Sequence, residues 1–92
     1  MEAAGIMSNN GLFPFVNSIV TNVDAISKSG IYAYNDTTMN TVLGYTWGMV
    51  IHFENNQNWG TFQIATTNKD NDNVLYFRKR LSANWGNWVP LM

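Results

Sequence analysis

The sequence of 92 residues has no cysteine and only one histidine, His52. Disulfides cannot brace the fold, and a zinc site built from several cysteine or histidine ligands is excluded. Charge is also scarce, since five basic and six acidic residues leave a net charge of −1. A nucleic-acid-binding domain usually carries a basic stripe, which these few basic residues cannot form. The fold must therefore be stabilised by packing or by partners.

Long apolar runs are missing as well. No segment approaches the roughly 18 consecutive apolar residues of a membrane-spanning helix, so we expect no membrane insertion. The first residues lack the basic region and apolar core of a signal peptide. The sequence is instead rich in asparagine, with 14 copies, and in tryptophan, with four. A cysteine-free chain with a surface of neutral amides suits a protein that works outside the cell.

Turn-forming residues divide the chain into short segments. Residues 1–15 contain two glycines and Pro14, and they are predicted to form a lead-in or linker. Residues 16–92 are predicted to form one small domain. From Val16 to Ile26 the apolar residues recur at helical spacing, which predicts a short helical segment that ends near Gly30.

Beyond Gly30 the sequence predicts a mainly β fold, with four to five short strands in a small antiparallel sheet that the helical segment precedes. The expected strands are 30–34, 47–53, 60–67, 74–81 and a short terminal strand around Trp88 and Val89. Side chains alternate between the two faces of a strand. Met49, Ile51 and Phe53 should therefore share one face, and Val50 and His52 the other.

Three patterns that suggest catalysis or metal binding are weak. The segment from Asp70 to Asn73 begins like a calcium loop, but the glycine and the glutamate that an EF-hand needs further along are missing. The carboxylates available for hydrolysis lie mostly in predicted turns, where solvated or capping roles are the default. His52 is expected to be a hydrogen-bonded structural residue. We therefore predict no enzyme, no catalytic residue, no cofactor and no metal site.

The basic trio Arg78-Lys79-Arg80 lies within a predicted strand. Alternation places the two arginines on one face and Lys79 on the other, so the trio does not form a single anion-binding patch. We expect an exposed strand whose charges discourage association between sheet edges.

The tryptophans are the strongest chemical signal. Trp47, Trp59, Trp85 and Trp88 lie at the ends of predicted strands, beside glycines and asparagines. Indole rings stack on the apolar faces of sugars, and amides bind sugar hydroxyls. At least two of the four should contribute to the core of so small a domain, and Trp59 and Trp85 are predicted to be exposed. The predicted ligand-binding residues are Trp59, Trp85, Asn58, Asn84, Tyr45 and Trp47.

Six short segments, taken in order, resemble the pyocin-knob type of module found in tail fibres of bacteriophages and prophages. They are Val23-Asp24-Ala25-Ile26, Gly30-Ile31-Tyr32, Gly48 to Phe53, Phe62 to Ala65, Leu75 to Arg78 and Trp85 to Trp88. The likeness spans roughly residues 20 to 92, and its specificity lies in the order and spacing of the pieces. The polar loop from Asn35 to Thr46 departs from it by lacking a proline, and the segment before Val16 has no counterpart.

The resemblance implies an extracellular part of the virion, at or near the distal end of a tail fibre, that is normally a homotrimer. Its partners would be further copies of itself and other tail-fibre or tail proteins, and residues 1–15 would include a remnant of the fibre stem. It implies framework roles for Gln63 and Arg78, with Arg78 pairing to Asp24 or to a backbone carbonyl. A trimer would also add the apolar contacts that a small sheet lacks.

Three functions follow from this interpretation. The leading one is binding of a host cell-surface receptor, a polysaccharide. The alternative is a purely structural knob or spacer that registers or caps the trimer, with the stripe from Val16 to Ile26 as the seam between chains. The least favoured is the carbohydrate-binding module of a cell-wall hydrolase, whose activity would depend on Asp36 or Glu54.

Overall fold

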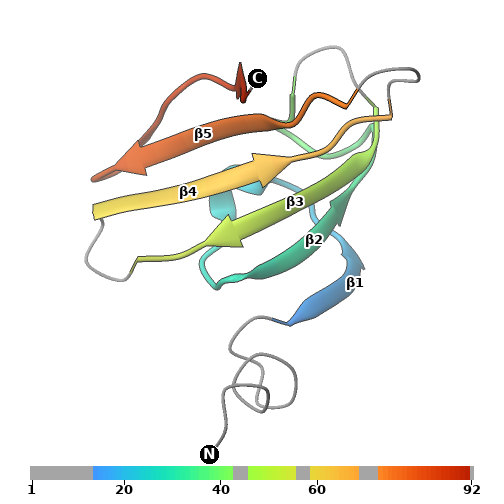
Figure 1. Ribbon diagram of the computed structural model, residues 1–92. Coiled ribbons are helices and arrows are strands. Elements are labelled where there is room, and N and C mark those ends of the chain that lie inside the picture. Colours follow the sequence, from blue (N-terminus) through green and yellow to red (C-terminus); the bar gives the residue numbers. More distant parts are fainter. Residues whose placement is uncertain (1–13, 43–45, 56–58, 69–72, 92) are drawn as a thin grey trace, which may run out of the picture.

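A computed structural model describes residues 14–42, 46–55, 59–68 and 73–91 of the chain. The fold is mainly β, as predicted, with seven strands in one sheet (Figure 1). In these residues the one helical element is a short 3-10 turn, η1 (Val23–Ala25). The strands are β1 (Phe15–Ile19), β2 (Gly30–Tyr34), β3 (Gly48–Phe53), β4 (Trp59–Ala65), β5 (Tyr76–Leu81), β6 (Asn84–Trp85) and β7 (Val89–Pro90).

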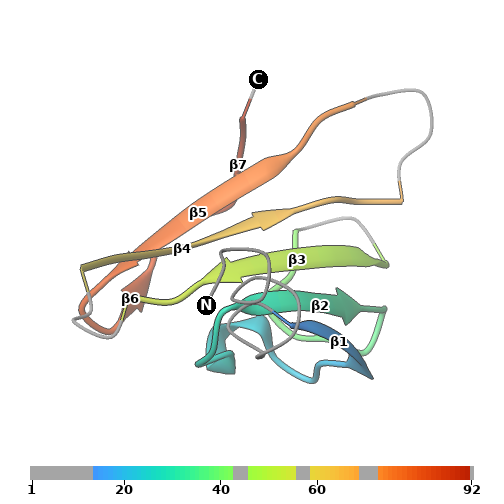
Figure 2. The same cartoon turned by 60° about the horizontal axis from the view of Figure 1, so that its bottom comes forward.

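The sheet is mixed, and not purely antiparallel as predicted. Strands β2 to β5 form an antiparallel meander in which each strand pairs with the next. Strand β1 adds one edge and runs parallel to β2. At the other edge, β6 pairs with the C-terminal end of β5 and β7 with its N-terminal end (Figures 1 and 2).

The segment from Val16 to Ile26 matches the predicted short helical segment only in part. Its first residues belong to β1, and only η1 turns, with Asn22 as its N-cap. All five apolar residues of the stripe are β-branched, which disfavours a helix and favours a strand. Val23 and Ile26 are buried in the core, whereas Ile19 is 46% exposed, so the stripe does not form one exposed face.

The other predicted strands are confirmed with small shifts. Strand β2 has the predicted bounds, and the ends of β3, β4, β5 and β7 lie within two residues of their predicted positions. Strand β6 falls in a segment predicted to be a loop, because two residues are too few to show an alternating pattern. Strand β1 begins at Phe15, the last residue of the predicted lead-in.

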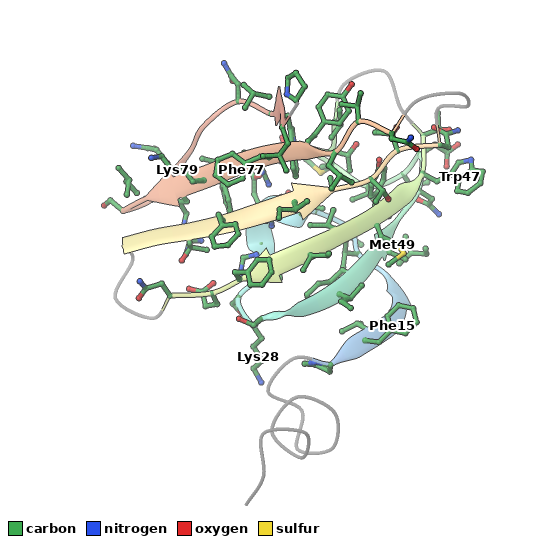
Figure 3. All side chains as sticks on the ribbon, viewed as in Figure 1. Phe15, Lys28, Trp47, Met49, Phe77 and Lys79 are labelled. Carbon is green, nitrogen blue, oxygen red and sulfur yellow. The ribbon has the colours of Figure 1, made fainter. Side chains whose placement is uncertain are left out.

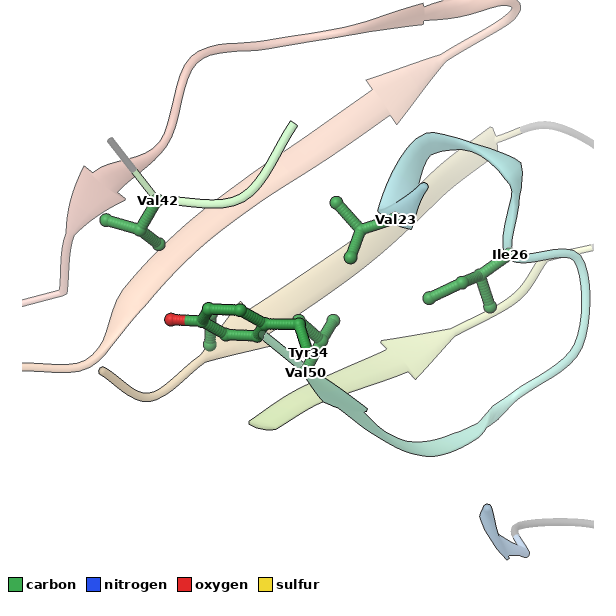
Figure 4. Close-up of a cluster of buried hydrophobic side chains, with 6 residues drawn as sticks. Val23, Ile26, Tyr34, Val42 and Val50 are labelled. Carbon is green, nitrogen blue, oxygen red and sulfur yellow. The ribbon is translucent and has the colours of Figure 1, made fainter. Parts of the chain in front are cut away.

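The two faces of the sheet differ in what covers them. The inner face is covered by η1 and by the loop that follows β2 (Figure 2). A small apolar core lies between these layers and consists of Val23, Ile26, Tyr34, Val42, Val50 and Ala65 (Figure 4). The outer face is the side seen in Figures 1 and 3, and it bears Met49, Ile51 and Phe53, which confirms the predicted alternation of β3.

Candidate functional site

A row of polar side chains crosses the inner face of the sheet. The strand register aligns His52 on β3 with Gln63 on β4 and with Arg78 on β5. His52 and Gln63 are fully buried, and Arg78 is only 5% exposed. Residues in register project from the same side of a sheet, so the three side chains meet beneath it.

Gln63 holds this polar row together through its side-chain amide. Its Nε2 donates to the carbonyl of Val23 at 2.8 Å and to Nδ1 of His52 at 3.0 Å. Its Oε1 accepts a hydrogen bond from Nε of Arg78 at 2.9 Å. The amide thus uses both of its donors and its acceptor, as a buried glutamine must.

The hydrogen bonds also determine the protonation state of His52. Its Nδ1 accepts from Gln63, so the ring proton sits on Nε2 and is donated to Oε1 of Glu54 at 2.8 Å. Burial is the main cause that lowers the pKa of His52 below its ordinary value of 6.5, and Glu54 opposes this effect. The positive charges of Arg80 and Arg78 lower the pKa further. His52 is a neutral, hydrogen-bonded structural residue, as predicted.

Acid should therefore weaken the fold through His52. Its pKa is lower in the folded chain, so the unfolded chain takes up the proton first as the pH falls below 6.5. The stabilisation that comes from the neutral form of His52 is fully present above pH 6.5. Below pH 6.5 the free energy of unfolding falls by up to about 1.4 kcal/mol per pH unit, until the pH reaches the pKa of His52 in the folded chain. Urea unfolding at pH 7.5 and pH 5, followed by tryptophan fluorescence, measures the loss.

The variant His52→Gln has no imidazole to titrate and should lose less stability over the same pH interval. An equal loss in both proteins would contradict this role of His52. Nitrogen NMR shifts of the ring at pH 7 provide a second check, because they should report an unprotonated Nδ1.

Arg78 joins the polar row to the C-terminal part of the chain. Its NH1 forms an ion pair with Oδ1 of Asp24 at 2.8 Å. Of the two partners expected for Arg78, Asp24 or a backbone carbonyl, the structure shows Asp24. Its guanidinium carbon lies 4.1 Å from the ring centroid of Trp85 and 4.6 Å from that of Trp88. Burial lowers the pKa of Arg78 and Asp24 raises it, and the guanidinium stays charged. Its NH2 is buried without a hydrogen-bond partner in the described part of the chain, so the two indoles supply compensating cation–π contacts.

The arginines of β5 are not the exposed charges that the sequence predicts. The side chain of Arg80 is only 15% exposed, pairs with Oε2 of Glu54 at 3.2 Å and lies 5.2 Å from the ring centroid of Trp85. The predicted alternation is nevertheless confirmed, because Lys79 points to the outer face and is exposed (Figure 3). The prediction fails because Trp85 and Trp88 pack over the arginines on the inner face.

Beside this network lies a cleft of about 590 Å³, which we call the C-terminal cleft. Four separate segments form it, namely η1, the loop before residue 43, strand β5 and the residues around β6 and β7. Its lining includes Asp24, Asn40, Tyr76, Arg78, Trp85, Asn87 and Trp88. The volume lies within the range of small-ligand sites.

Hydrogen bonds of the two indoles hold these segments together. Nε1 of Trp88 donates to the carbonyl of Asn40 at 2.9 Å, and Nε1 of Trp85 contacts the carbonyl of Asp24 at 3.4 Å. Asn40 has a φ of 68°, a left-handed conformation that asparagine adopts more readily than most residues. Its Nδ2 donates to the side chain of Asn22 at 2.8 Å, which ties the loop to the start of η1.

The lining suits a neutral, hydroxyl-rich ligand. Trp85 and Trp88 are half-buried and line the cleft. Asn40 and Asn87 are exposed and offer amide donors and acceptors. The side chain of Asp24 is 37% exposed, and its carboxylate can accept from a hydroxyl. A sugar offers both an apolar face and hydroxyls, and it matches this set of groups.

The structure brings together only part of the predicted ligand-binding set. Trp85 lines the cleft, and Asn84 precedes it in β6 as an exposed residue. Trp47 is 61% exposed, lies just before β3 (Figure 3) and does not line the cleft. Trp59 starts β4, but its side chain lies outside the described part of the structure. Asn58 and Tyr45 also lie outside the described residues.

Several cleft residues were not among the predicted ones. Trp88 and Asn87 belong to the same asparagine- and tryptophan-rich stretch as Trp85. The composition of this stretch could therefore have identified them as cleft residues. Asn40 and Tyr76 carry no such signal, because only the folded chain brings them to the cleft. At least two tryptophans were expected in the core. Trp85 and Trp88 are half-buried, and none of the described indoles is fully buried, so the expectation is met only in part.

Comparisons with known proteins found no family model, no curated protein and no solved structure that matches the chain. Among the described residues, no three histidine or acidic side chains gather as metal ligands do. The same residues contain no helix with the length and apolar character needed to span a membrane. The function must therefore be inferred from the site itself.

Proposed function

We propose that this chain is the distal module of a phage or prophage tail fibre and that its C-terminal cleft binds a polysaccharide of the host surface. The observation that carries the proposal is the lining of the cleft, in which indoles lie beside exposed neutral amides. The resemblance to pyocin-knob modules supports the location in the virion and an extracellular setting. A knob-like domain over residues 16–92 is part of the same proposal.

The energetics of such a site favour several copies. Hydroxyl-to-amide hydrogen bonds contribute about 1 kcal/mol each, and a single shallow site binds sugars weakly. In a homotrimer, three clefts act together, and avidity then raises the overall affinity by about a hundredfold or more where the geometry allows simultaneous contact. The proposed role needs no catalytic group.

Replacing Asn87 with alanine should weaken glycan binding about fivefold, because the cleft loses one exposed amide that can bond a hydroxyl. The measurement uses labelled protein on an array of bacterial surface polysaccharides, followed by titration of the best ligand. Asn84→Ala is the matched control, since Asn84 is also exposed but does not line the cleft. The control should bind like the wild type. Absence of binding to any host polysaccharide, or equal binding by both variants, would count against the cleft as the receptor site.

A structural knob remains the second candidate function, and one observation favours it. The outer face of the sheet is apolar and only partly buried within the described chain. The hydrolase-module interpretation has weaker support, because Glu54 is engaged by His52 and Arg80.

A further inference from the structure

One apolar row runs across the whole outer face of the sheet. The strand register places one residue from each of six strands in this row, and every one of them is apolar. In order, they are Phe15, Ile31, Ile51, Ile64, Phe77 and Val89. Phe15 is 64% exposed and Val89 48% exposed, and the four between them are partly exposed. We call this set the outer row.

Further apolar side chains broaden the outer row on both sides. Phe53 and Phe62 stack with ring centroids 4.5 Å apart, and Phe62 lies 5.9 Å from Phe77. On the other side Met49, aligned with Ala33, is 38% exposed. The described strands place a single charged side chain on this face, Lys79 (Figure 3).

The covering layers of the described chain all lie on the opposite side of the sheet. The 3-10 turn η1 and the loop after β2 pack on the inner face, so they leave the outer face open (Figure 2). The more apolar face of a sheet is usually the covered one. Within the described chain, the polar row of His52, Gln63 and Arg78 is covered and the outer row is left uncovered.

The size of the outer face is that of a functional apolar patch. Six strands spaced about 4.8 Å apart and about five residues long give a flat area of about 400 Å². That is comparable to the largest apolar patch on a typical monomer, which is often functional. It is about half of the roughly 800 Å² that each partner contributes to a standard interface. Its aromatic, methionine-containing and nearly uncharged composition is also typical of interface cores.

We infer that the outer face is the surface through which copies of this chain associate. Two copies of a nearly uncharged face can meet without like-charge repulsion. A different protein partner would usually be selected by complementary charges, and this face offers almost none. Packed sheets lie about 10 Å apart, a distance at which the outer rows of neighbouring copies contact each other. Association through this face does not depend on the receptor proposal, because the C-terminal cleft lies on the inner side.

The test compares two methionines in the full chain. Met49 lies on the outer face, whereas Met39, which is 59% exposed, belongs to the loop on the inner side. Light scattering and sedimentation of the wild type at about 100 µM should show an assembly of two or three chains. Met49→Lys should weaken association at least tenfold, because it buries a charge in the interface. Met39→Lys should leave the mass unchanged.

Phe15→Lys, at the edge of the outer row, is a second variant expected to weaken association. Circular dichroism confirms that each variant is folded. A single-chain mass for the folded wild type would overturn the inference, as would equal association of the Met49→Lys and Met39→Lys proteins. Glycan titration of the same variants separates the two proposals, since a monomeric variant retains the C-terminal cleft.

Discussion

Replacing Arg78 with methionine should lower the free energy of unfolding by about 3 kcal/mol. The substitution keeps the volume of the side chain but removes the cation that pairs with Asp24 and donates to Oε1 of Gln63. It also removes the guanidinium that lies between Trp85 and Trp88. Breaking a buried pair is costly because the remaining partner loses its compensation, and partial exposure of Asp24 keeps the cost at the lower end of the usual range.

Chemical denaturation followed by tryptophan fluorescence measures this loss. Lys28→Met is the matched control, because it also exchanges a cation for methionine but at an exposed position. The control should change stability by no more than about 0.5 kcal/mol. Arg78→Lys should fall between the two, since an ammonium keeps the charge but lacks the planar fork that reaches both partners. If Arg78→Met were as stable as the control, the polar row would not hold the inner face together.

Replacing Gly48 with alanine should destabilise the fold by about 2 kcal/mol. A Cβ at this position would lie 2.5 Å from the carbonyl oxygen of Thr66 and 2.9 Å from the hydroxyl oxygen of Tyr34. These two oxygens are hydrogen-bonded to each other at 2.8 Å, and Tyr34 is buried in the core. The added methyl group must therefore push apart backbone and core, and overpacking of this kind costs about 1 to 3 kcal/mol.

Gly86→Ala is the matched control for this substitution. The nearest atom to a Cβ at Gly86 is the carbonyl oxygen of Lys79 at 3.5 Å, an ordinary contact distance. Thermal unfolding should therefore show a clear drop in Tm for Gly48→Ala and little change for Gly86→Ala. Similar Tm values for the two variants would show that the contact of Gly48 with Thr66 and Tyr34 relaxes without cost.

Much of the sheet was predictable, and the first strand was not. Alternation in β3 to β5 is a local property of an extended chain, so it could be read from residues such as Ile51 and His52. The segment from Val16 to Ile26 satisfies a helical spacing and at the same time consists of residues that prefer strands. The pairing of β1 with β2 decided between the two, and that pairing depends on residues outside the segment.

The candidate site was predictable to a smaller degree. Trp85 was found from its setting between an asparagine and a glycine, whereas Trp47, which was also predicted to bind the ligand, does not line the cleft. The cleft combines η1, the loop before residue 43, β5 and the C-terminal residues, and no local pattern connects these segments. Arg78 and Asp24 meet across 54 positions of sequence, and their pairing was expected from the family resemblance alone.

The sequence by itself determined strands β2 to β5, the alternation of their faces and the absence of a disulfide or multi-histidine metal brace. Only the tertiary structure decided which face is covered. Alternation fixes which residues share a face, but the covering layer comes from η1, the loop after β2 and the two tryptophans near β6 and β7, Trp85 and Trp88. These layers cover His52, Gln63 and Arg78, whose polar groups form hydrogen bonds with one another. The described chain leaves the apolar outer row uncovered.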